Sequence, residues 1–258
     1  MAARRRQAVI TSVEELGERI ARVDLEGQGI GEGVAPGRFV MVEAPGHPEC
    51  ILLRPFSYFL TPTPDSIALL VRGVGTGTDA LISAPPGTPV AVLGPLGNAF
   101  PEPPGTVWAV AGGVGAAPFG MFAGSSEVTV LFGARSVADA GFARALEASG
   151  LTTRLATDDG SGGFHGTVVD LLRESLREER PGAIYSCGPG PMMAAVAAVA
   201  KESGIPCHVS LEERMGCGIG ICRGCSHLDA TGGWRCICED GPVYPAEVIF
   251  GPPPEEGL

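Results

Sequence analysis

The sequence lacks the marks of two large protein classes. It contains no run of about 18 uninterrupted apolar residues, the length that a membrane-spanning helix requires, and the apolar stretch Met192–Ala200 is far too short. Basic residues are scarce: 18 Lys and Arg stand against 29 Asp and Glu and give a formal net charge of −11. A broad nucleic-acid surface needs clustered Lys and Arg. The composition therefore argues against a membrane span and against a nucleic-acid partner.

A secretory signal is also missing. The short basic run Arg4–Arg6 is not followed by the apolar stretch of a signal peptide, and we interpret it as a solvated end of the chain. Eight cysteines without such a signal predict a reducing compartment, the cytoplasm, where clustered cysteines more often bind metal than form disulfides. Cys50, Cys187 and Cys207 are scattered, whereas the other five cysteines fall between positions 217 and 238.

Hydrophobic residues, glycine and proline are plentiful. Hydrophobic residues make up 45% of the 258 positions, enough for one large domain, or for two modest ones with an appendage. The 39 glycines and 23 prolines show no collagen-like period. We interpret them as turns of a β-rich protein and as places where the backbone approaches a cofactor.

Three segments with different patterns predict a multi-domain α+β fold. Residues 1–101 contain short alternating runs between Gly/Pro turns, which is typical of a small antiparallel β-barrel. These runs include Arg38–Glu43, Ile67–Arg72 and Pro89–Leu93. The Pro-rich stretch Pro101–Gly105 is a candidate linker to the second segment.

In residues 102–208 strands and helices alternate, which predicts a parallel sheet with helices on both faces. The expected strands are Val107–Ala111, Glu127–Phe132, Thr153–Thr157 and Ala183–Ser186. The expected helices begin at Ala117 and cover Ala138–Ser149, 167–179 and 191–203. Residues 209–258 are too few to build much core by themselves, so a bound cluster is expected to organise them.

The cysteines of the third segment have the spacing of a [2Fe–2S] site. Cys217-x4-Cys222-x2-Cys225 is followed after twelve residues by Cys238, and the plant-type pattern is C-x4-C-x2-C with a distant fourth cysteine. Two irons bridged by two sulfides need four thiolates around a compact unit. Glycines in the loop let backbone N–H groups face the sulfurs, which raises the reduction potential. Zinc is the main alternative and free thiols the other, but Cys236-x-Cys238 is a poor zinc hook.

The fourth ligand is either Cys238 or Cys236. Trp234–Cys238 is expected to be a strand, which would place both cysteines on one face. Cys238 directly precedes the turn signal Glu239–Pro242, and we favour it as the ligand.

Two motifs in the first segment suit a flavin. In Arg54–Ser57 (RPFS) the guanidinium can pair with a phosphate and the serine hydroxyl can bond to a flavin ring atom. Downstream, the Gly-Thr pair before an expected helix at 79–83 would present backbone N–H groups to a pyrophosphate. Taken alone, the motifs also fit a surface arginine and an ordinary turn with a helix cap. The candidate flavin-binding residues are Arg54, Pro55, Phe56, Ser57, Leu70, Val71, Arg72, Gly77 and Thr78.

Two motifs in the second segment suit a nucleotide. Gly112–Pro118 (GGVGAAP) follows a buried strand and predicts a tight strand-to-helix turn under a ligand, although a plain turn is the alternative. Cys187–Met192 (CGPGPM) follows another strand at the edge of the sheet where open α/β folds bind ligands. Cys187 would lie against a nicotinamide, or else be a small buried hydrophobic residue. The candidate residues are Gly113, Gly115, Cys187, Gly188 and Pro189.

Together, RPFS, GGVGAAP and CGPGPMM resemble the ferredoxin–NADP reductase superfamily. The order of barrel, nucleotide domain and [2Fe–2S] segment is narrower and resembles the electron transfer subunits of dihydroorotate dehydrogenase B. Gly94–Phe100, Ser210–Met215 and the cysteine loop followed by Cys238–Val243 carry this likeness. It covers nearly the whole chain, and Met215–Cys225 is its most specific part.

The resemblance implies an oxidoreductase subunit of pyrimidine biosynthesis with FAD in the barrel (1–101), NAD at the α/β domain (102–208) and a [2Fe–2S] cluster in 209–258. It implies a partner, the FMN-containing catalytic subunit that oxidises dihydroorotate to orotate, in a heterotetramer of two copies of each. Carried over by position, Arg54–Ser57, Leu70–Arg72 and Gly77-Thr78 would contact FAD. The cluster ligands would be Cys217, Cys222, Cys225 and Cys238. Cys236 is an extra cysteine relative to the family pattern.

These inferences predict a chain of carriers. Electrons would enter singly at the cluster and leave in pairs as hydride to NAD⁺, with FAD as the converter. No general acid–base dyad is expected, and the histidines are interpreted as structural or surface residues: His47, His165, His208 and His227. Alternatives are a reductase subunit of a hydrogenase, of an NADH–ferredoxin/NADP transhydrogenase or of an oxygenase, and a non-catalytic zinc-binding module on the same fold.

The choice between NAD and NADP depends on the second segment. An arginine near the 2′-position of the adenosine would favour NADP. Arg135 and Arg154 are the candidates, and the sequence does not place either of them.

Overall fold

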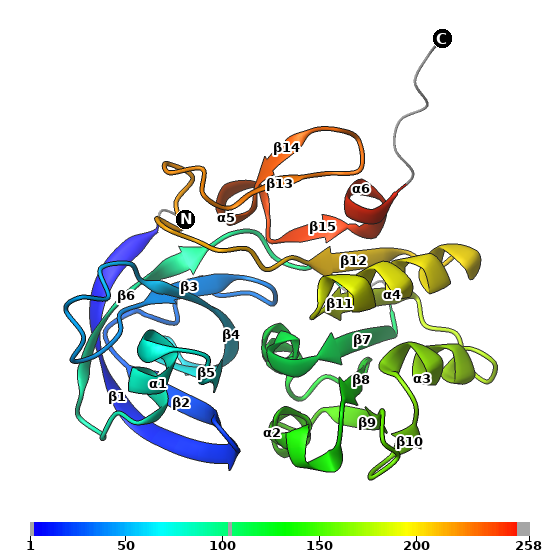
Figure 1. Cartoon of the computed structure of the whole chain (residues 1–258), viewed down its shortest axis with the longest axis horizontal. Helices are drawn as coiled ribbons and strands as arrows, with labels where there is room; N and C mark the ends of the chain where they lie inside the picture. Colours follow the sequence, from blue (N-terminus) through cyan, green and yellow to red (C-terminus); the bar gives the residue numbers. More distant parts are fainter. Residues whose placement is uncertain (1–2, 103–104, 252–258) are drawn as a thin grey trace.

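The computed structural model of the chain describes residues 3–102 and 105–251 (Figure 1). A barrel and a helix-covered sheet lie side by side, and the C-terminal part of the chain lies across the neighbouring ends of both (Figure 1). Part of the candidate linker, and the Pro-rich stretch after residue 251, fall outside the described residues. No helix within these ranges is both long and apolar enough to cross a membrane.

The first segment forms the predicted antiparallel barrel, which closes in the order β1-β2-β5-β4-β3-β6. Alternation along the strands sends one set of side chains inward, where Ile10, Val23 and Leu69 are fully buried. The strands are β1 Arg4–Gly17, β2 Ile20–Glu26, β3 Phe39–Val42, β4 Arg54–Thr63, β5 Ser66–Arg72 and β6 Pro89–Leu96, with helix α1 Thr76–Ile82 between the last two.

Arg4 and Arg5 are exposed to solvent as expected, but the interpretation of Arg4–Arg6 as a tail outside the fold is wrong. This run is the start of β1 and pairs with Val92–Gly94 of β6. Closure of the barrel explains the difference, because β1 must pair with β6 over its first half and with β2 over its second. Arg6 also forms an ion pair with Glu32, with 3.1 Å between Nη2 and Oε2.

The second segment forms a sheet of order β10-β9-β8-β7-β11-β12-β15, which is parallel except for β15 (Val243–Pro245) of the third segment. Trp108 and Val110 join the apolar cluster on one face, with α3 and α4, whereas Ala109 joins the cluster on the other face, with α2. The prediction of helices on both faces is confirmed. The elements are β7 Val107–Gly112, β8 Val128–Ala134, α2 Gly141–Ala148, β9 Thr152–Thr157, β10 Phe164–His165, α3 Val168–Ser175, β11 Ala183–Cys187, α4 Gly190–Glu202 and β12 Cys207–Ser210.

The helix expected from Ala117 is a 3₁₀ helix that spans Gly113–Phe122 and begins directly after β7. Pro118 lies inside it and cannot donate an N–H to a helical hydrogen bond. Gly120 packs against the barrel so closely that a Cβ there would lie 2.4 Å from the carbonyl oxygen of Phe59. The segment therefore joins the sheet to the barrel by backbone contact.

The C-terminal segment extends the second segment's sheet. Its elements are β13 Ser226–Leu228, β14 Trp234–Cys236, α5 Ile237–Asp240, β15 Val243–Pro245 and α6 Ala246–Phe250. β15 pairs antiparallel with β12, and Ile237, Tyr244 and Ile249 belong to the same apolar cluster as Trp108 of the sheet. The expected strand Trp234–Cys238 is wrong in its second half, because β14 ends at Cys236 and Cys238 lies in α5.

Asn98 joins the barrel to this segment. Its side-chain amide donates to the carbonyl oxygen of Val243 at 2.8 Å and accepts from the Val243 N–H at 2.9 Å. Its backbone N–H donates to the carbonyl oxygen of Gly241 at 2.7 Å. A single half-buried side chain thus makes a reciprocal pair of hydrogen bonds at the start of β15.

We expect Asn98→Ala to lower the free energy of unfolding by about 1–3 kcal/mol, because both polar groups of Val243 lose their side-chain partner. Asn98→Asp retains the acceptor and is expected to lose less. Urea unfolding followed by circular dichroism measures the shift of the midpoint. Equal midpoints for the wild type and Asn98→Ala would contradict a stabilising role for this contact.

Candidate functional site

Two cavities adjoin where the barrel meets the sheet. The barrel cavity has a volume of about 590 Å³ and the sheet cavity about 760 Å³. The two share a wall of five residues that line both of them: Arg72, Val114, Leu211, Glu212 and Glu213. Large cavities of this kind, lined mainly by apolar groups with a few polar ones, are typical of cofactor sites.

The barrel cavity brings together most of the predicted flavin-binding residues. Those that line it are Pro55, Phe56, Ser57, Leu70, Arg72 and Thr78. Val71 does not, because strand alternation directs its side chain into the buried interior of the barrel.

Arg54 and Gly77 lie against each other beside this cavity. Arg54 donates to the carbonyl oxygens of Cys50 and Leu52 within its own loop. A Cβ added at Gly77 would lie 2.2 Å from Nε of Arg54, so the guanidinium packs directly on the first turn of α1. The helix that the sequence predicted at 79–83 begins earlier, at Thr76, so that it includes both Gly77 and Thr78.

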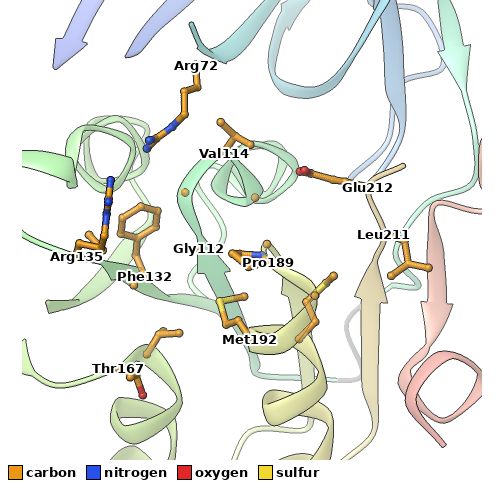
Figure 2. Close-up of a pocket in the computed structure, with 18 of the residues that line it drawn as sticks. Arg72, Gly112, Val114, Phe132, Arg135, Thr167, Pro189, Met192, Leu211 and Glu212 are labelled. Carbon is orange, nitrogen blue, oxygen red and sulfur yellow. The ribbon is translucent and has the colours of Figure 1, made fainter. Parts of the chain in front are cut away.

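The sheet cavity is built from the two predicted Gly-rich turns. Gly113, Gly115, Gly188 and Pro189 line it after the carboxyl ends of β7 and β11. Figure 2 shows Gly112 and Pro189 close together at these ends. Cys187 does not line it: its side chain is 1% exposed and lies in the apolar cluster beneath. Burial raises the pKa of the Cys187 thiol well above its ordinary value, so the thiol stays neutral.

The two candidate arginines have different surroundings. Arg135 lines the sheet cavity together with Asp139 and Asp158, and its Nε lies 3.8 Å from an oxygen of Asp139. Arg154 is absent from the lining, pairs with Glu179 at 3.6 Å and lies over the ring of Trp108.

Glu212 is a cavity residue that sequence reasoning missed. It follows β12 and directs its carboxylate toward Val114, between the two cavities (Figure 2). Its side chain is open to the cavity, yet the surrounding protein removes enough water to raise its pKa. The available signal was its place in Ser210–Met215, a segment noted in the sequence only for its family likeness.

Residues of the Ser210–Met215 segment connect the cavities to the cysteines. Arg214 and Met215 line the barrel cavity, and Cys217 follows two positions later. The loop then packs on the barrel: a Cβ at Gly218 would lie 2.8 Å from Cγ of Met41. The cysteine loop and the flavin-cavity wall are therefore one continuous stretch of chain.

Four cysteine sulfurs accept backbone N–H groups. Cys217 Sγ accepts from Ile219 and Cys222 at 3.5 and 3.4 Å. The other three bonds are Gly224 N–H to Cys222 Sγ at 3.4 Å, Cys238 N–H to Cys225 Sγ at 3.4 Å, and Gly220 N–H to Cys238 Sγ at 3.1 Å. Bonds of this kind stabilise a thiolate and thereby favour metal binding.

The donated bonds lower the pKa of a thiol and burial raises it, so the net shift differs between an outer and a buried cysteine. The N–H groups of Cys222 and Ile219 lower the pKa of Cys217 to about 7. Burial raises the pKa of Cys238, so that its thiol becomes an anion only together with a bound metal. An all-sulfur donor set with N–H groups directed at the sulfurs fits an iron–sulfur cluster.

Comparison with known proteins agrees with this geometry. Residues 212–250 match the family model of the iron-sulfur cluster binding domain of dihydroorotate dehydrogenase B. The chain is 39% identical over 227 residues to the dihydroorotate dehydrogenase B (NAD(+)) electron transfer subunit of Desulforamulus reducens, covering 82% of this chain and 85% of that one. It is 34% identical over 264 residues to the corresponding subunit of Shouchella clausii, covering 96% and 100%.

A solved structure shows the same architecture. The NADH-dependent reduced ferredoxin-NADP oxidoreductase, described for flavin-based electron bifurcation, superposes with a TM-score of 0.83 at 27% identity, covering 93% of this chain and 88% of that one. The C-terminal segment is thus an iron–sulfur binding domain on a ferredoxin reductase fold. On the identities and coverage above, the chain belongs to the family of dihydroorotate dehydrogenase B electron transfer subunits.

Proposed function

We propose that this chain carries electrons between the FMN of a dihydroorotate dehydrogenase catalytic subunit and NAD⁺, by way of its own [2Fe–2S] cluster and FAD. The observation that carries the proposal is the continuity of the site. The chain that lines the barrel cavity at Met215 becomes the cysteine loop two residues later, and Glu212 of the same stretch borders the sheet cavity. Three cofactor positions thus follow one another along a short path.

The barrel cavity supplies the groups that a flavin needs. When bound there, FAD converts between the single electrons of an iron–sulfur cluster and the hydride of a nicotinamide. Ser57 offers a hydroxyl to it, whereas the Thr78 hydroxyl is held at the start of α1, where it accepts from the N–H groups of Val74 and Gly75 and donates to the Gly75 carbonyl oxygen. Arg72 offers the cation at the junction of the two cavities, where Figure 2 shows its guanidinium pointing toward the sheet cavity. A pyrophosphate at that junction would pair with Arg72.

The sheet cavity supports NAD rather than NADP as its nucleotide. Asp139 and Asp158 line the same end of the cavity as Arg135, and Asp139 lies within ion-pair distance of it. Two carboxylates disfavour an added 2′-phosphate by repulsion, and acidic groups at this place in the fold suit a ribose hydroxyl.

The cysteine loop offers the docking face for the catalytic subunit. Ile221 is 79% exposed and Ile219 is 43% exposed, although both flank cluster ligands. Exposed aliphatic side chains in a group mark interaction sites. A partner seated on them would lie next to Cys222, which is itself exposed, and electron transfer requires such close approach. The assembly we propose contains two copies of each subunit.

The electron path predicts that loss of the cluster leaves the step between NADH and FAD intact and abolishes the step between the catalytic subunit and FAD. In Cys222→Ala, anaerobic NADH should still reduce the bound FAD, because the barrel and sheet cavities are unchanged. Dihydroorotate-dependent formation of NADH by the complex should fall to background. Stopped-flow absorbance follows both steps, with Cys50→Ala as the control cysteine. Wild-type rates of both steps in a cluster-free variant would disprove the path.

The nucleotide site predicts a strong effect of one added methyl group. A Cβ at Gly115 would lie 2.3 Å from the carbonyl oxygen of Cys187, which is backbone and cannot turn aside. We expect Gly115→Ala to displace the turn and to raise the KM for NADH about tenfold or more, with flavin content unchanged. Gly190→Ala is the matched control in the same cavity, since a Cβ there meets nothing within 4 Å. Similar KM values for the two variants would contradict the assignment of the turn.

The docking face predicts a selective loss of assembly. We expect Ile221→Asp to weaken binding of the catalytic subunit at least about tenfold, because a charge replaces an apolar contact at the centre of the interface. Its NADH-to-dye activity should stay at the wild-type level. Val137→Asp, on the second segment, changes a side chain that is 45% exposed and serves as control. Analytical ultracentrifugation with the catalytic subunit measures affinity and stoichiometry, and unchanged binding of Ile221→Asp would place the partner elsewhere.

A further inference from the structure

A fifth thiol lies among the cluster ligands. Cys236 Sγ is 3.6 Å from Cys225 Sγ and 3.8 Å from Cys238 Sγ, and its side chain is 1% exposed. The three sulfurs lie within 4.8 Å of one another. Four thiolates complete a [2Fe–2S] cluster, so one of the five cysteines is surplus.

The hydrogen bonds identify the surplus thiol. Cys238 Sγ accepts the N–H of Gly220 at 3.1 Å, and Cys225 Sγ accepts the N–H of Cys238. Within the described part of the chain, the only hydrogen bonds of Cys236 Sγ are with the other two sulfurs. Because N–H donors stabilise thiolates, Cys238 is the resting ligand and Cys236 is the additional thiol beside it.

The distances give this thiol access to the same iron. Two thiolates on one tetrahedral metal, each at about 2.3 Å, are separated by roughly 3.8 Å. Cys236 lies at this separation from Cys225 and from Cys238 alike. Cys236 Sγ can therefore share one metal ion with Cys225 Sγ with little change of the backbone.

The backbone around Cys236 is fixed independently of the sulfur of Cys238. The Cys236 N–H donates to Asp240 Oδ2 at 2.7 Å, and the Ile237 N–H donates to the carbonyl oxygen of Cys225 at 3.1 Å. The backbone N–H of residue 238 donates to Cys225 Sγ at 3.4 Å, so its donor does not depend on the Cys238 side chain either. Replacement of the Cys238 side chain leaves all three in place.

We propose that Cys236 is a reserve ligand of the cluster. When the sulfur of Cys238 is removed, the Cys236 thiol releases its proton to solvent and forms the iron–sulfur bond that Cys238 made. No electron is gained or lost in this exchange. The inference concerns the cluster itself and holds whichever partner supplies the electrons.

The test compares Cys238→Ala, Cys238→Val, Cys236→Ala, the double variant Cys236→Ala/Cys238→Ala, and Cys222→Ala. Each is reconstituted anaerobically with iron and sulfide, and the readouts are iron and sulfide per chain, visible absorbance, and the paramagnetic resonance of the reduced cluster. Bound flavin and thermal unfolding identify the variants that are folded, and the substitution of Cys238 that retains flavin is the one compared.

The reserve ligand predicts full iron and sulfide in each single variant of Cys236 and Cys238, and loss of the cluster in the double variant and in Cys222→Ala. The cluster of the Cys238 variant should have an altered resonance and a lower reduction potential, because its new ligand lacks the N–H of Gly220. A folded Cys238 variant without iron would overturn the proposal. An altered resonance in Cys236→Ala with an unaltered one in Cys238→Ala would also overturn it, since Cys236 would then be the resting ligand.

Discussion

Backbone pairing between β12 and β15 joins the cysteine-bearing end of the chain to the nucleotide-binding sheet. His208 to Ser210 pair with Val243 to Pro245, and Asn98 of the barrel bonds to both polar groups of Val243. The stretch between β12 and β15 is thereby held at the ends of both the barrel and the sheet. Everything in that stretch, from Glu212 to Cys238, takes its position from this anchoring.

The anchoring explains how a short segment can serve three cofactor sites. Ser210–Met215 leaves the sheet, borders both cavities and enters the barrel wall before the first cysteine. The loop then folds against Met41 and Leu96 of the barrel, so the glycine N–H groups face sulfur instead of solvent. Apolar packing of Ile237 and Tyr244 in the sheet's own core stabilises the segment beyond what a bound cluster contributes.

Much of the fold could be predicted because its signals are local. Period-two runs marked the barrel strands, and alternation of apolar runs with helical patterns marked the sheet. The prediction for Arg4–Arg6 was wrong because closure of the barrel, a long-range requirement, makes these charged residues part of a strand. The prediction that Cys238 lies in a strand was wrong because the chain turns into α5 after Cys236. The bond from the Cys236 N–H to Asp240 and packing on the sheet hold this turn.

For the candidate site too, local features could be predicted from the sequence and long-range contacts could not. The sequence by itself determined which residues are candidates for the chemistry: the spacing of Cys217, Cys222 and Cys225, the RPFS motif and the Gly-rich turns each lie within a few adjacent positions. The tertiary structure alone decided which of these groups face a cavity. Strand alternation buries Val71 and turns Arg72 to the cavity, whereas Cys187 is buried at the end of β11 and Gly188 lines the cavity in the turn that follows. The tertiary structure also brought Glu212 to the cavities, and it directs a backbone N–H at the sulfur of Cys238, the observation on which the proposed choice of Cys238 over Cys236 rests. Such contacts depend on chain segments that meet only after folding, so spacing alone cannot encode them.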